Sequence, residues 1–367
     1  MQQQKCPQLT QLCSAQQGDG TNSPWPVTGS HGRLSDALRY SRPMQAILSV
    51  TVPFFALVLC GYLAARRHVL PESAIPGLNA FVLYFALPCL LFRFGANTPI
   101  LELLNPSVLA VYLASALLIV FFTVSTSLNE RVHLKDAAFG ALVAAFPNTG
   151  FMGVPLLVAL LGPAAAGPVI CSMLADLFVT SSLCIALAQA TVKGEGSPGG
   201  ARAAALRALR GALSNPLPWS IALGAVFSVA SLKLPGPAQS IVNLLADAAT
   251  PVALFTIGAV LFRAGQHATG RTPLQDYLPV ALIKLFLHPL LVLVLGLAAQ
   301  QLGAPLSGFQ LMVLTLAAAL PSASNVSLLA ERFGADNGRI ARIIMSSTVL
   351  AFGTFSLAAW MFGVRPG

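Results

Sequence analysis

The sequence contains few charged residues. Asp, Glu, Lys and Arg make up 9% of its 367 residues, whereas 56% of the residues are hydrophobic and the mean hydropathy is +0.75. A soluble domain usually has about 25% charged residues, so this composition could not cover a surface in water. The net charge of +9 does not indicate nucleic-acid binding, because the basic residues are thinly spread and are not interleaved with aromatic ones. The composition predicts an integral membrane protein.

Motifs of several enzyme classes are also missing. The sequence has no G-x-x-x-x-G-K-[ST] phosphate-binding loop, no H-E-x-x-H zinc motif and no G-x-S-x-G nucleophile motif. Four of the six cysteines lie in apolar segments, and none forms a C-x-x-C pair: Cys6, Cys13, Cys60, Cys89, Cys171 and Cys184. This usage favours cysteines that pack as small hydrophobic residues. We therefore predict no metal site and no cofactor.

The first 43 residues differ from the rest of the chain. They are polar, rich in Gln and without hydrophobic periodicity, and they lack the apolar core of a signal peptide. Residues 1–43 are therefore predicted to be a disordered tail. Met44 opens the first apolar run directly, so translation could also start there.

Ten apolar segments are long enough to be membrane helices, which need about 20 apolar residues. The sequence thus predicts an all-α integral membrane protein. The longest internal connection, 192–214, is Gly-rich and then basic, and it separates a first group of five spans in 44–191 from a second group in 215–367. The predicted spans are 44–65, 74–94, 106–128, 137–161, 164–190, 215–232, 238–262, 277–300, 308–330 and 340–362.

The basic residues of the connections lie almost entirely on one side. The odd-numbered connections contain 13 Lys and Arg residues, whereas the even-numbered ones contain only Arg93 and Lys233. Lys and Arg are enriched in cytoplasmic loops, so the odd-numbered connections are predicted to be cytoplasmic and both termini to lie outside. The basic residues of the tail conflict with this orientation, and the conflict disappears if translation starts at Met44.

The two halves share short patterns in equivalent spans. Residues 88–96 of the second span and 251–259 of the seventh both fit P-x-x-L-F-x-x-G-A. The fourth and ninth spans both have a mid-span Pro followed by Asn, in 147–148 and in 321–325. Because five is an odd number, two like halves in succession enter the membrane in opposite directions. The patterns favour an inverted repeat, a common architecture of secondary transporters, with chance similarity as the alternative.

The fourth and ninth spans are unlike continuous membrane helices. Pro lacks a backbone donor, Gly loosens the backbone, and the freed polar groups cannot face lipid. Breaks in the middle of the membrane would create helix ends whose N–H groups and partial positive charge could together hold a small anion. The alternative is a pair of Pro-kinked helices whose polar residues bond neighbouring helices. The predicted substrate-binding residues are Pro147, Asn148, Thr149, Gly150, Pro321, Ser322, Ser324 and Asn325.

Three charged residues lie inside predicted spans, where a charge costs at least about 2.5 kcal/mol and suggests a function. Asp176 lies midway along the fifth span and is a candidate proton or cation site. Asp247 lies nearer the outer end of the seventh span, where a structural hydrogen bond is favoured. Lys284 either attracts an anionic substrate or extends toward the cytoplasmic interface. We expect His288 to be packed and Arg332 to be solvated.

These residues make the sequence similar to the auxin efflux carrier family, which includes plant PIN-type auxin carriers and many bacterial members. The resemblance covers about 46–362, and its specific motifs are 147–155 and 320–325. Weaker similarity lies in 78–88, 215–216 and 251–258.

Membership in this family would imply two inverted five-helix repeats, with interrupted fourth and ninth helices that cross at the substrate site. Carried over residue by residue, the crossing prolines are Pro147 and Pro321, and the polar crossing residues are Asn148 and Asn325. Spans one, two, six and seven would form a scaffold, often dimeric, and the other six would move as an elevator. The chain lacks the long central loop of the plant members, and bacterial members are commonly linked to small carboxylates such as malonate or malate.

The sequence therefore predicts a secondary-active or potential-driven carrier of a small organic anion in the cell membrane, in a bacterium the inner membrane. An inside-negative potential favours anion exit by about 2.3 kcal/mol per charge per 100 mV, whereas uptake needs a co-transported proton or sodium ion. The expected partners are the anion, this cation, the lipid bilayer and a second copy of the chain. The alternatives are a ligand sensor and an intramembrane enzyme with Asp176 and Asp247 as a dyad, although the two aspartates have dissimilar neighbours.

Overall fold

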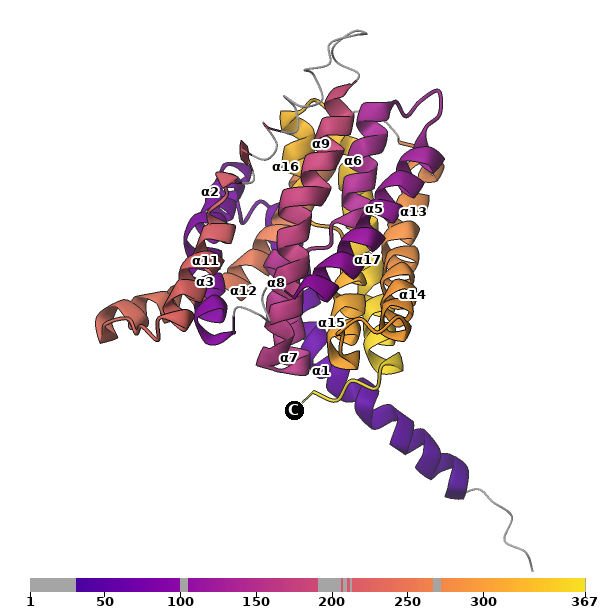
Figure 1. Cartoon of the computed structure of the whole chain (residues 1–367). Helices are drawn as coiled ribbons and strands as arrows, with labels where there is room; N and C mark the ends of the chain where they lie inside the picture. The colour runs from indigo at the N-terminus through magenta and orange to yellow at the C-terminus, as the bar shows by residue number, and fades with distance from the viewer. Residues whose placement is uncertain are drawn as a thin grey trace, which may run out of the picture. The chain divides into compact units, whose positions relative to one another are not determined.

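The computed structural model describes residues 31–99, 105–190, 206, 210–211, 213–266 and 272–366. The described secondary structure is helical and contains no strand, and the residues from Ser41 onward form one compact unit (Figure 1). Residues 1–30 of the predicted tail and most of the predicted loop 192–214 lie outside the described residues. Helix α1 begins at His31, within the segment predicted to be disordered.

Apolar helices make up nearly all of the described structure. Their bounds are α1 His31–Arg66, α2 Ile75–Phe81, α3 Leu87–Asn97, α5 Pro106–Ser127, α6 Leu134–Ala145, α7 Val154–Leu161, α8 Ala166–Ala175, α9 Ser181–Ala190, α11 Pro216–Val229, α12 Gly236–Gln266, α13 Leu274–Leu282, α14 His288–Gln301, α15 Gly308–Ala318, α16 Val326–Arg332 and α17 Asn337–Met361. Short π-helical turns join α2 to α3, α8 to α9 and α13 to α14, so each of these pairs forms one longer rod.

Seven described helical segments are long and apolar enough to cross a membrane. Three further apolar helices are shorter: Thr149–Leu161, Pro216–Val229 and Gly308–Ala318. The protein is therefore an all-helical membrane protein, as its composition predicts, whereas the arrangement of ten spans stays a prediction.

Asparagine followed by proline starts two of the helices. The Asn105 side chain accepts hydrogen bonds from the amides of Ser107 and Val108 at the start of α5. The Asn215 side chain accepts one from the Leu217 amide at the start of α11. In both helices the next residue is Pro, which has no N–H to leave unpaired and is preset to a helical φ. These local signals explain why the predicted starts of both spans lie within one residue of the observed starts.

Helices α1 and α12 approach so closely that glycine is required on both. A Cβ at Gly61 would overlap the carbonyl oxygen of Phe255, and a Cβ at Gly258 would overlap that of Val58. Small residues allow membrane helices to bring their backbones together, and the association then depends on van der Waals packing. This contact ties the first described span to α12.

Helices α3 and α11 meet in the same way. A Cβ at Gly224 would overlap the carbonyl oxygen of Phe92, and a Cβ at Gly95 would lie 2.7 Å from the carbonyl oxygen of Ile221. Phe92 and Phe227 also pack edge to face across this contact, with ring centroids 5.2 Å apart. The contact ties α3 to α11.

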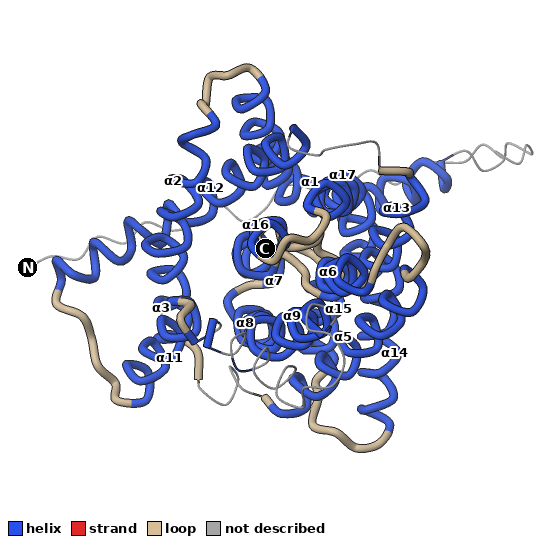
Figure 2. The backbone as a smooth tube through the Cα atoms, turned by 90° about the horizontal axis from the view of Figure 1, so that it is seen from above, coloured by secondary structure: helices blue, strands red, loops and turns tan. Residues whose placement is uncertain are grey.

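The four glycines of these contacts are regularly spaced in the sequence. Gly224 follows Gly61 by 163 residues, and Gly258 follows Gly95 by the same 163 residues. Gly95 and Gly258 are also the glycines of the two P-x-x-L-F-x-x-G-A matches. The repeated pattern therefore coincides with two equivalent helix contacts. In Figure 2, α2, α3, α11 and α12 lie on the left and α5, α13 and α14 on the right, with α7 and α16 between them.

Candidate functional site

The helical rods of the fourth and ninth predicted spans are interrupted. Helix α6 ends at Ala145, Phe146 is extended, and helical structure resumes at Thr149 as a π-helical turn that leads into α7. Helix α15 ends at Ala318, and α16 begins only at Val326. Each interruption contains a proline of the predicted site, and proline disfavours a helical conformation in the residue before it.

The two interruptions pair with each other through their backbones. The Asn148 amide donates to the Pro321 carbonyl at 2.8 Å, and the Ala323 amide donates to the Phe146 carbonyl at 3.0 Å. Together the two bonds form one short antiparallel bridge. The pairing satisfies backbone groups that could not be left unpaired in a membrane. It also brings together Pro147 and Ser322, which lie 175 residues apart in the chain.

Ser322 holds this crossing together. Its hydroxyl donates to the Val143 carbonyl at 2.7 Å, and its amide donates to the Ser347 hydroxyl at 3.2 Å. Its hydroxyl also lies 3.1 Å from the Ser347 hydroxyl. Ser324 is buried as well, but its hydroxyl has no hydrogen bond to another described residue. Of the two predicted serines, only Ser322 is thus engaged in holding helices together.

Other polar side chains at the crossing are buried without a partner. Thr149 Oγ1 and Asn325 Oδ1 have no hydrogen bond among the described residues, and the Thr149 side chain is fully buried. Asn148 is 3% exposed, and its side chain does not cap the helix that follows it. Leaving a buried polar group unpaired costs about 1–3 kcal/mol. A concentration of such groups is expected where a ligand supplies the missing bonds.

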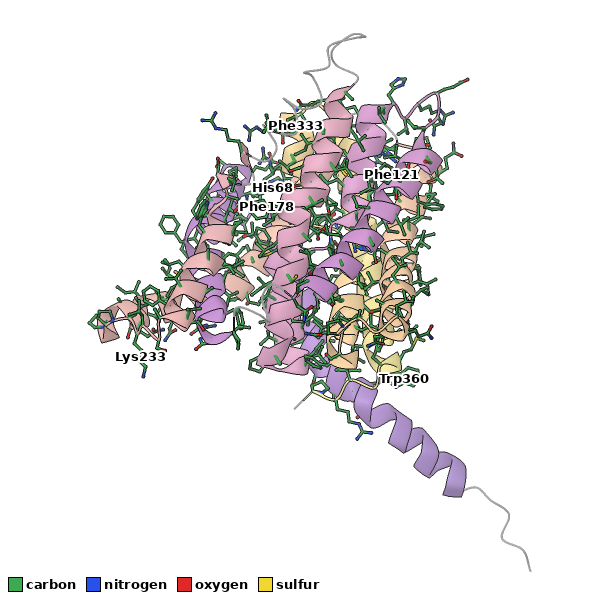
Figure 3. The ribbon with its side chains drawn as sticks, viewed as in Figure 1. His68, Phe121, Phe178, Lys233, Phe333 and Trp360 are labelled. Atoms are coloured by element: carbon green, nitrogen blue, oxygen red, sulfur yellow. The ribbon has the colours of Figure 1, made fainter. Side chains whose placement is uncertain are left out.

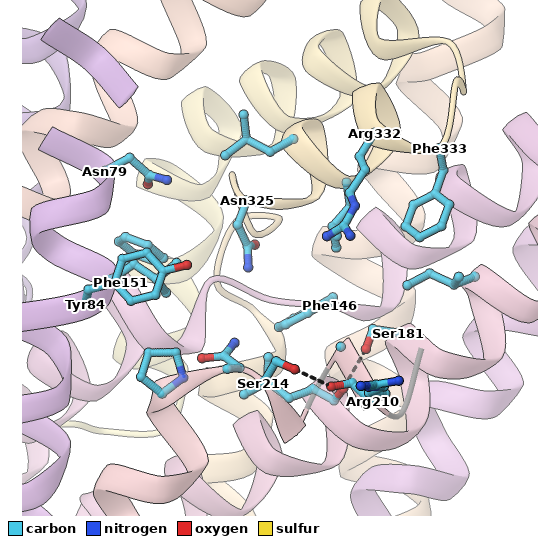
Figure 4. Close-up of a pocket in the computed structure, with 18 of the residues that line it drawn as sticks. Asn79, Tyr84, Phe146, Phe151, Ser181, Arg210, Ser214, Asn325, Arg332 and Phe333 are labelled. Carbon is cyan, nitrogen blue, oxygen red and sulfur yellow. Dashed lines mark hydrogen bonds between the residues drawn. The ribbon is translucent and has the colours of Figure 1, made fainter. Parts of the chain in front are cut away.

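A cavity of about 700 Å³ lies beside the crossing (Figure 4). Asn325 lines it, and Figure 4 shows the amide nitrogen of Asn325 directed into it, toward Phe146. Tyr84 and Phe151 contribute aromatic rings to its wall, and Asn79 adds an amide. Pro147, Asn148, Thr149, Gly150, Pro321, Ser322 and Ser324 are not among the residues that line it.

Two arginines also line the cavity. Arg210 comes from the segment before α11, and Arg332 is the last residue of α16. Arg332 is exposed, as the sequence predicts, but its guanidinium shares the cavity with Asn325. The lining residue Phe333 lies near the upper end of the molecule in Figure 3, whereas Lys233 and Trp360 lie toward the lower end. The cavity thus lies toward the end of the protein that carries Arg332.

Asp176 is fully buried and accepts two hydrogen bonds. The Tyr112 hydroxyl donates to Oδ2 at 2.6 Å, and Thr180 Oγ1 donates to Oδ1 at 3.0 Å. Tyr112 comes from α5, whereas Asp176 and Thr180 belong to the π-helical turn between α8 and α9. Asp176 is not among the residues that line the cavity, although its neighbour Leu177 is.

Lys284 is also fully buried, so its side chain does not extend to the membrane interface. Its Nζ donates to the Ala318 carbonyl at 2.6 Å and lies 3.2 Å from Nδ1 of His288. His288 is packed and fully buried, as expected, but its Nε2 has no partner among the described residues. Lys284 does not line the cavity either. Its contact is with the last residue of α15, where the second interruption begins.

Asp247 has a different environment. Its Oδ1 lies 2.7 Å from Nη1 of Arg93, and 68% of its side chain is exposed. The ion pair joins α12 to α3, which agrees with a structural hydrogen bond. No hydrogen bond joins Asp247 to Asp176, which has its own partners in Tyr112 and Thr180. Among the described residues, no group of three His, Cys, Asp or Glu could hold a metal ion.

Sequence reasoning missed several features around the crossing. Tyr112 lies in an apolar span, and its role follows only from its hydrogen bond to Asp176, which belongs to a distant segment. The π-helical turns could not be predicted from local sequence, since helix propensity does not distinguish them. Such turns are frequent at functional sites. Here they lie at the cavity, at the crossing and at the two buried charges: Val82–Ala86, Thr149–Gly153, Asp176–Thr180 and Ile283–Leu287.

Comparisons with known proteins agree with this picture. Residues 46–361 match the family described as membrane transport protein. A protein of Rhizobium meliloti (strain 1021) with the name "Putative malonate transporter" is 30% identical over 330 residues, which cover 88% of this chain and 98% of that protein. The uncharacterized transporter YfdV of Escherichia coli (strain K12) is 25% identical over 286 residues, 77% of this chain and 87% of that protein.

A plant relative matches a smaller part of the chain. Auxin efflux carrier component 7 of Arabidopsis thaliana is 29% identical over 126 residues, which cover 32% of this chain and 19% of that protein. These relatives are carriers and transporters by name, not enzymes. The chain therefore belongs to the membrane transport protein family, which also contains the auxin efflux carriers.

Proposed function

We propose that the protein is a secondary-active or potential-driven transporter of a small organic anion, which binds at the crossing of the two interrupted helices. The observation that carries this proposal is the set of buried, unpartnered polar groups at the crossing, Thr149 Oγ1 and Asn325 Oδ1, beside a cavity of about 700 Å³. The crossing also joins two helix ends in the interior of an apolar bundle, where water is scarce. A ligand there would find a hydroxyl that can donate or accept and an amide oxygen that can accept, already in place.

The polarity of these groups favours an anion. Helix Thr149–Leu161 begins at the crossing, and the start of a helix carries a partial positive charge and unpaired N–H groups. The Thr149 hydroxyl and the Asn325 amide nitrogen can both donate hydrogen bonds. Arg210 and Arg332 add full positive charges on the wall of the same cavity and would raise the local concentration of anions.

The transport mechanism we propose is an elevator. The equal 163-residue spacing of the two glycine contacts supports two inverted five-helix repeats within ten spans. In this arrangement α1, α2, α3, α11 and α12 form the scaffold, through which two copies of the chain associate. The remaining helices carry the crossing past it. The cavity, which is lined by Asn79 and Tyr84 of the scaffold and by Asn325 of the crossing, is then the open side of the site.

The membrane setting follows from the same proposal. The basic end of the protein, with Arg332, faces the cytoplasm and both termini face outward. The substrate is a carboxylate such as malonate or malate, or another weak acid. The malonate in the name of the Rhizobium meliloti relative supports this class. Exit of the anion is driven by the membrane potential, whereas uptake needs a co-transported proton or sodium ion, for which Asp176 is the candidate site.

A thermal-shift panel on the purified full chain tests the proposal. A ligand that binds only the folded state raises the melting temperature in a concentration-dependent way. Malonate, malate, acetate and indole-3-acetate represent the carboxylates, and methylammonium and glucose serve as matched non-anionic controls. We expect stabilisation by at least one carboxylate and by neither control. Stabilisation by none of the carboxylates, or equally by all six compounds, would contradict a carboxylate site.

A further inference from the structure

The carboxyl-terminal end of α15 lies at the crossing and is held by a lysine. The end of a helix leaves carbonyl oxygens without intrahelical partners and carries a partial negative charge. In secondary transporters with broken helices, such ends coordinate the coupling sodium ion or proton. Here the carbonyl of Ala318, the last residue of α15, accepts a hydrogen bond from Lys284 Nζ at 2.6 Å. An ammonium group therefore sits where a cation would be expected.

The second contact of this ammonium fixes the histidine beside it. Lys284 Nζ lies 3.2 Å from His288 Nδ1. An ammonium has donors only, so Nδ1 must be the acceptor, and a neutral His288 then carries its proton on Nε2. Nε2 is the atom that has no partner among the described residues. The histidine is thus placed as a neutral ligand of the ammonium, as it would be for a metal cation.

Asp176 lies on the other side of this cluster. The ring of Tyr112, whose hydroxyl bonds Asp176, lies against the ring of His288 with centroids 5.9 Å apart. Asp176 and Lys284 are close enough for their charges to interact, but no direct ion pair joins them. Among the described residues, the other titratable groups near the two charges are Tyr112, His288 and Cys184, and Cys171 lies near Tyr112.

We propose that Lys284 is a built-in cation that takes the place of a bound sodium ion, and that transport is coupled instead to a proton carried by the Asp176 carboxylate. This inference rests on the proposed anion transport. The fixed positive charge of Lys284 occupies the carbonyl end of α15 and repels a second metal cation. Sodium would therefore have neither the ligand nor the favourable field that it needs at this position.

The Asp176 carboxylate can accept a proton without losing its hydrogen bonds. Both of its present partners are hydroxyls, which rotate and can accept as well as donate. When a proton binds one carboxylate oxygen, the Tyr112 or Thr180 hydroxyl on that side turns to accept it. Before protonation Asp176 and Lys284 sum to zero charge, and afterwards to one positive charge. That charge offsets one negative charge of the anion carried in the same step, and the proton is released when the site opens to the other side.

Uptake of labelled malonate into proteoliposomes, with the membrane potential clamped at zero, tests the coupling. A gradient of one pH unit, acid outside, can drive about tenfold accumulation if one proton accompanies each malonate. We expect accumulation to approach this value and a tenfold sodium gradient at equal pH to give none. Accumulation driven by sodium, or by neither gradient while malonate exchange proceeds, would overturn the proton coupling. Absence of exchange with every carboxylate that stabilises the protein would instead contradict the proposed function.

Asp176→Asn separates coupling from folding. Asn keeps an acceptor for Tyr112 and Thr180 but cannot carry the proton. We expect malonate exchange at equal pH to persist, whereas accumulation driven by the pH gradient falls from about tenfold to none. Asp247→Asn, which removes an exposed carboxylate, is the matched control and should accumulate like the wild type. Persistent accumulation in Asp176→Asn, or an equal loss of exchange and accumulation, means that Asp176 has no coupling role.

The role of Lys284 is tested by melting in detergent. Replacing choline chloride with sodium chloride at equal ionic strength should leave the melting temperature of the wild type and of the exposed control Lys233→Ala unchanged. In Lys284→Ala the vacant position should be filled by sodium, so that this variant is stabilised by sodium chloride. The proposal is contradicted if sodium changes the melting temperature of the wild type. It is also contradicted if Lys284→Ala folds and its melting temperature does not change with sodium. If Lys284→Ala does not fold, the proposal is tested by the effect of sodium on wild-type melting and by malonate accumulation in Asp176→Asn.

Discussion

Helices of this protein meet at close range in two different ways. At the contacts of α1 with α12 and of α3 with α11, glycines bring the backbones together, and the atoms nearest to an added Cβ are backbone atoms. At the crossing of the two interrupted helices, backbone amides and carbonyls pair, and Thr149 and Asn325 keep polar atoms without partners in the part of the chain that the structure describes. The glycine contacts need no further partner, whereas the crossing has polar atoms that a ligand could still bind.

This difference indicates that the glycine contacts have a structural role and that the crossing has a binding role. Glycine contacts depend on van der Waals packing, which is lost when the helices slide or separate. The crossing is stabilised by its bridge and by Ser322, yet it retains the cost of unpaired polar groups. Proteins keep such groups where a ligand completes them. We therefore expect mutations at the glycines to affect folding, and mutations at the crossing to affect binding and transport.

The largest effect is expected at the glycines. Gly61→Ala and Gly258→Ala each place a Cβ against a backbone carbonyl that cannot move aside, so we expect a loss of about 3 kcal/mol or more of stability and little folded protein. The fraction that elutes as folded protein after mild heating in detergent measures this. Gly353→Ala in α17, where no atom lies within 4 Å of the added Cβ, is the matched control and should melt like the wild type. Wild-type melting of Gly61→Ala would contradict the close contact.

The next effect concerns binding. Asn148→Ala and Asn325→Ala should each raise the dissociation constant for malonate at least about tenfold, since a hydrogen bond to a charged group contributes about 1.5–3 kcal/mol. Their melting temperatures without ligand should stay close to that of the wild type. Titration calorimetry gives the constants, with Asn243→Ala in α12 as a control. Unchanged affinity in both variants would remove the crossing from the binding site.

The two serines of the crossing, Ser322 and Ser324, are expected to have different roles. Ser322→Ala removes the donor to the Val143 carbonyl and should lower the free energy of unfolding by about 1 kcal/mol, with a smaller effect on malonate affinity. The Ser324 hydroxyl has no partner among the described residues, so Ser324→Ala should leave the melting temperature unchanged. Thermal melting of both variants with and without malonate distinguishes the roles. Equal destabilisation by the two substitutions would show that the hydrogen bond from Ser322 to Val143 does not contribute to the free energy of unfolding.

The smallest effect is expected at the cavity wall. Arg332→Gln should raise the apparent KM for malonate a few-fold at low ionic strength, because the exposed guanidinium acts by attracting the anion. At about 1 M salt the Debye length is about 3 Å, and the difference from the wild type should nearly vanish. Uptake at two salt concentrations measures this, with the exposed Arg131→Gln as control. A KM effect that is independent of salt would point to direct contact with the substrate instead.

Much of the fold could be predicted because its signals are local. Long apolar runs, Asn-Pro helix starts and mid-span prolines marked the helices and their interruptions. Pro147 and Pro321 were assigned to one site from the repeat and the family resemblance, and the structure brings their segments into contact. The repeated P-x-x-L-F-x-x-G-A pattern pointed to Gly95 and Gly258, although the role of these glycines in helix contacts was not foreseen.

What could not be predicted depends on contacts between distant segments. The sequence does not decide between an interfacial and a substrate-attracting role for Lys284, because its partner, the Ala318 carbonyl, is supplied by a different helix. Tyr112 carries no signal of its own until Asp176 is placed opposite it. The sequence predicts only that Arg332 is solvated, since the cavity that it lines is formed by five different parts of the chain. Tertiary packing, not local propensity, decides each of these roles.

Counterflow of malonate tests the central claim most directly. Proteoliposomes that are loaded with unlabelled malonate and diluted into a trace of labelled malonate accumulate label transiently only if one site opens alternately to both sides. We predict such accumulation with the wild type and with Asn243→Ala, and none with the double variant Asn148→Ala and Asn325→Ala. Absence of counterflow with the wild type for every carboxylate that stabilises it, or undiminished counterflow with the double variant, would contradict transport at this crossing.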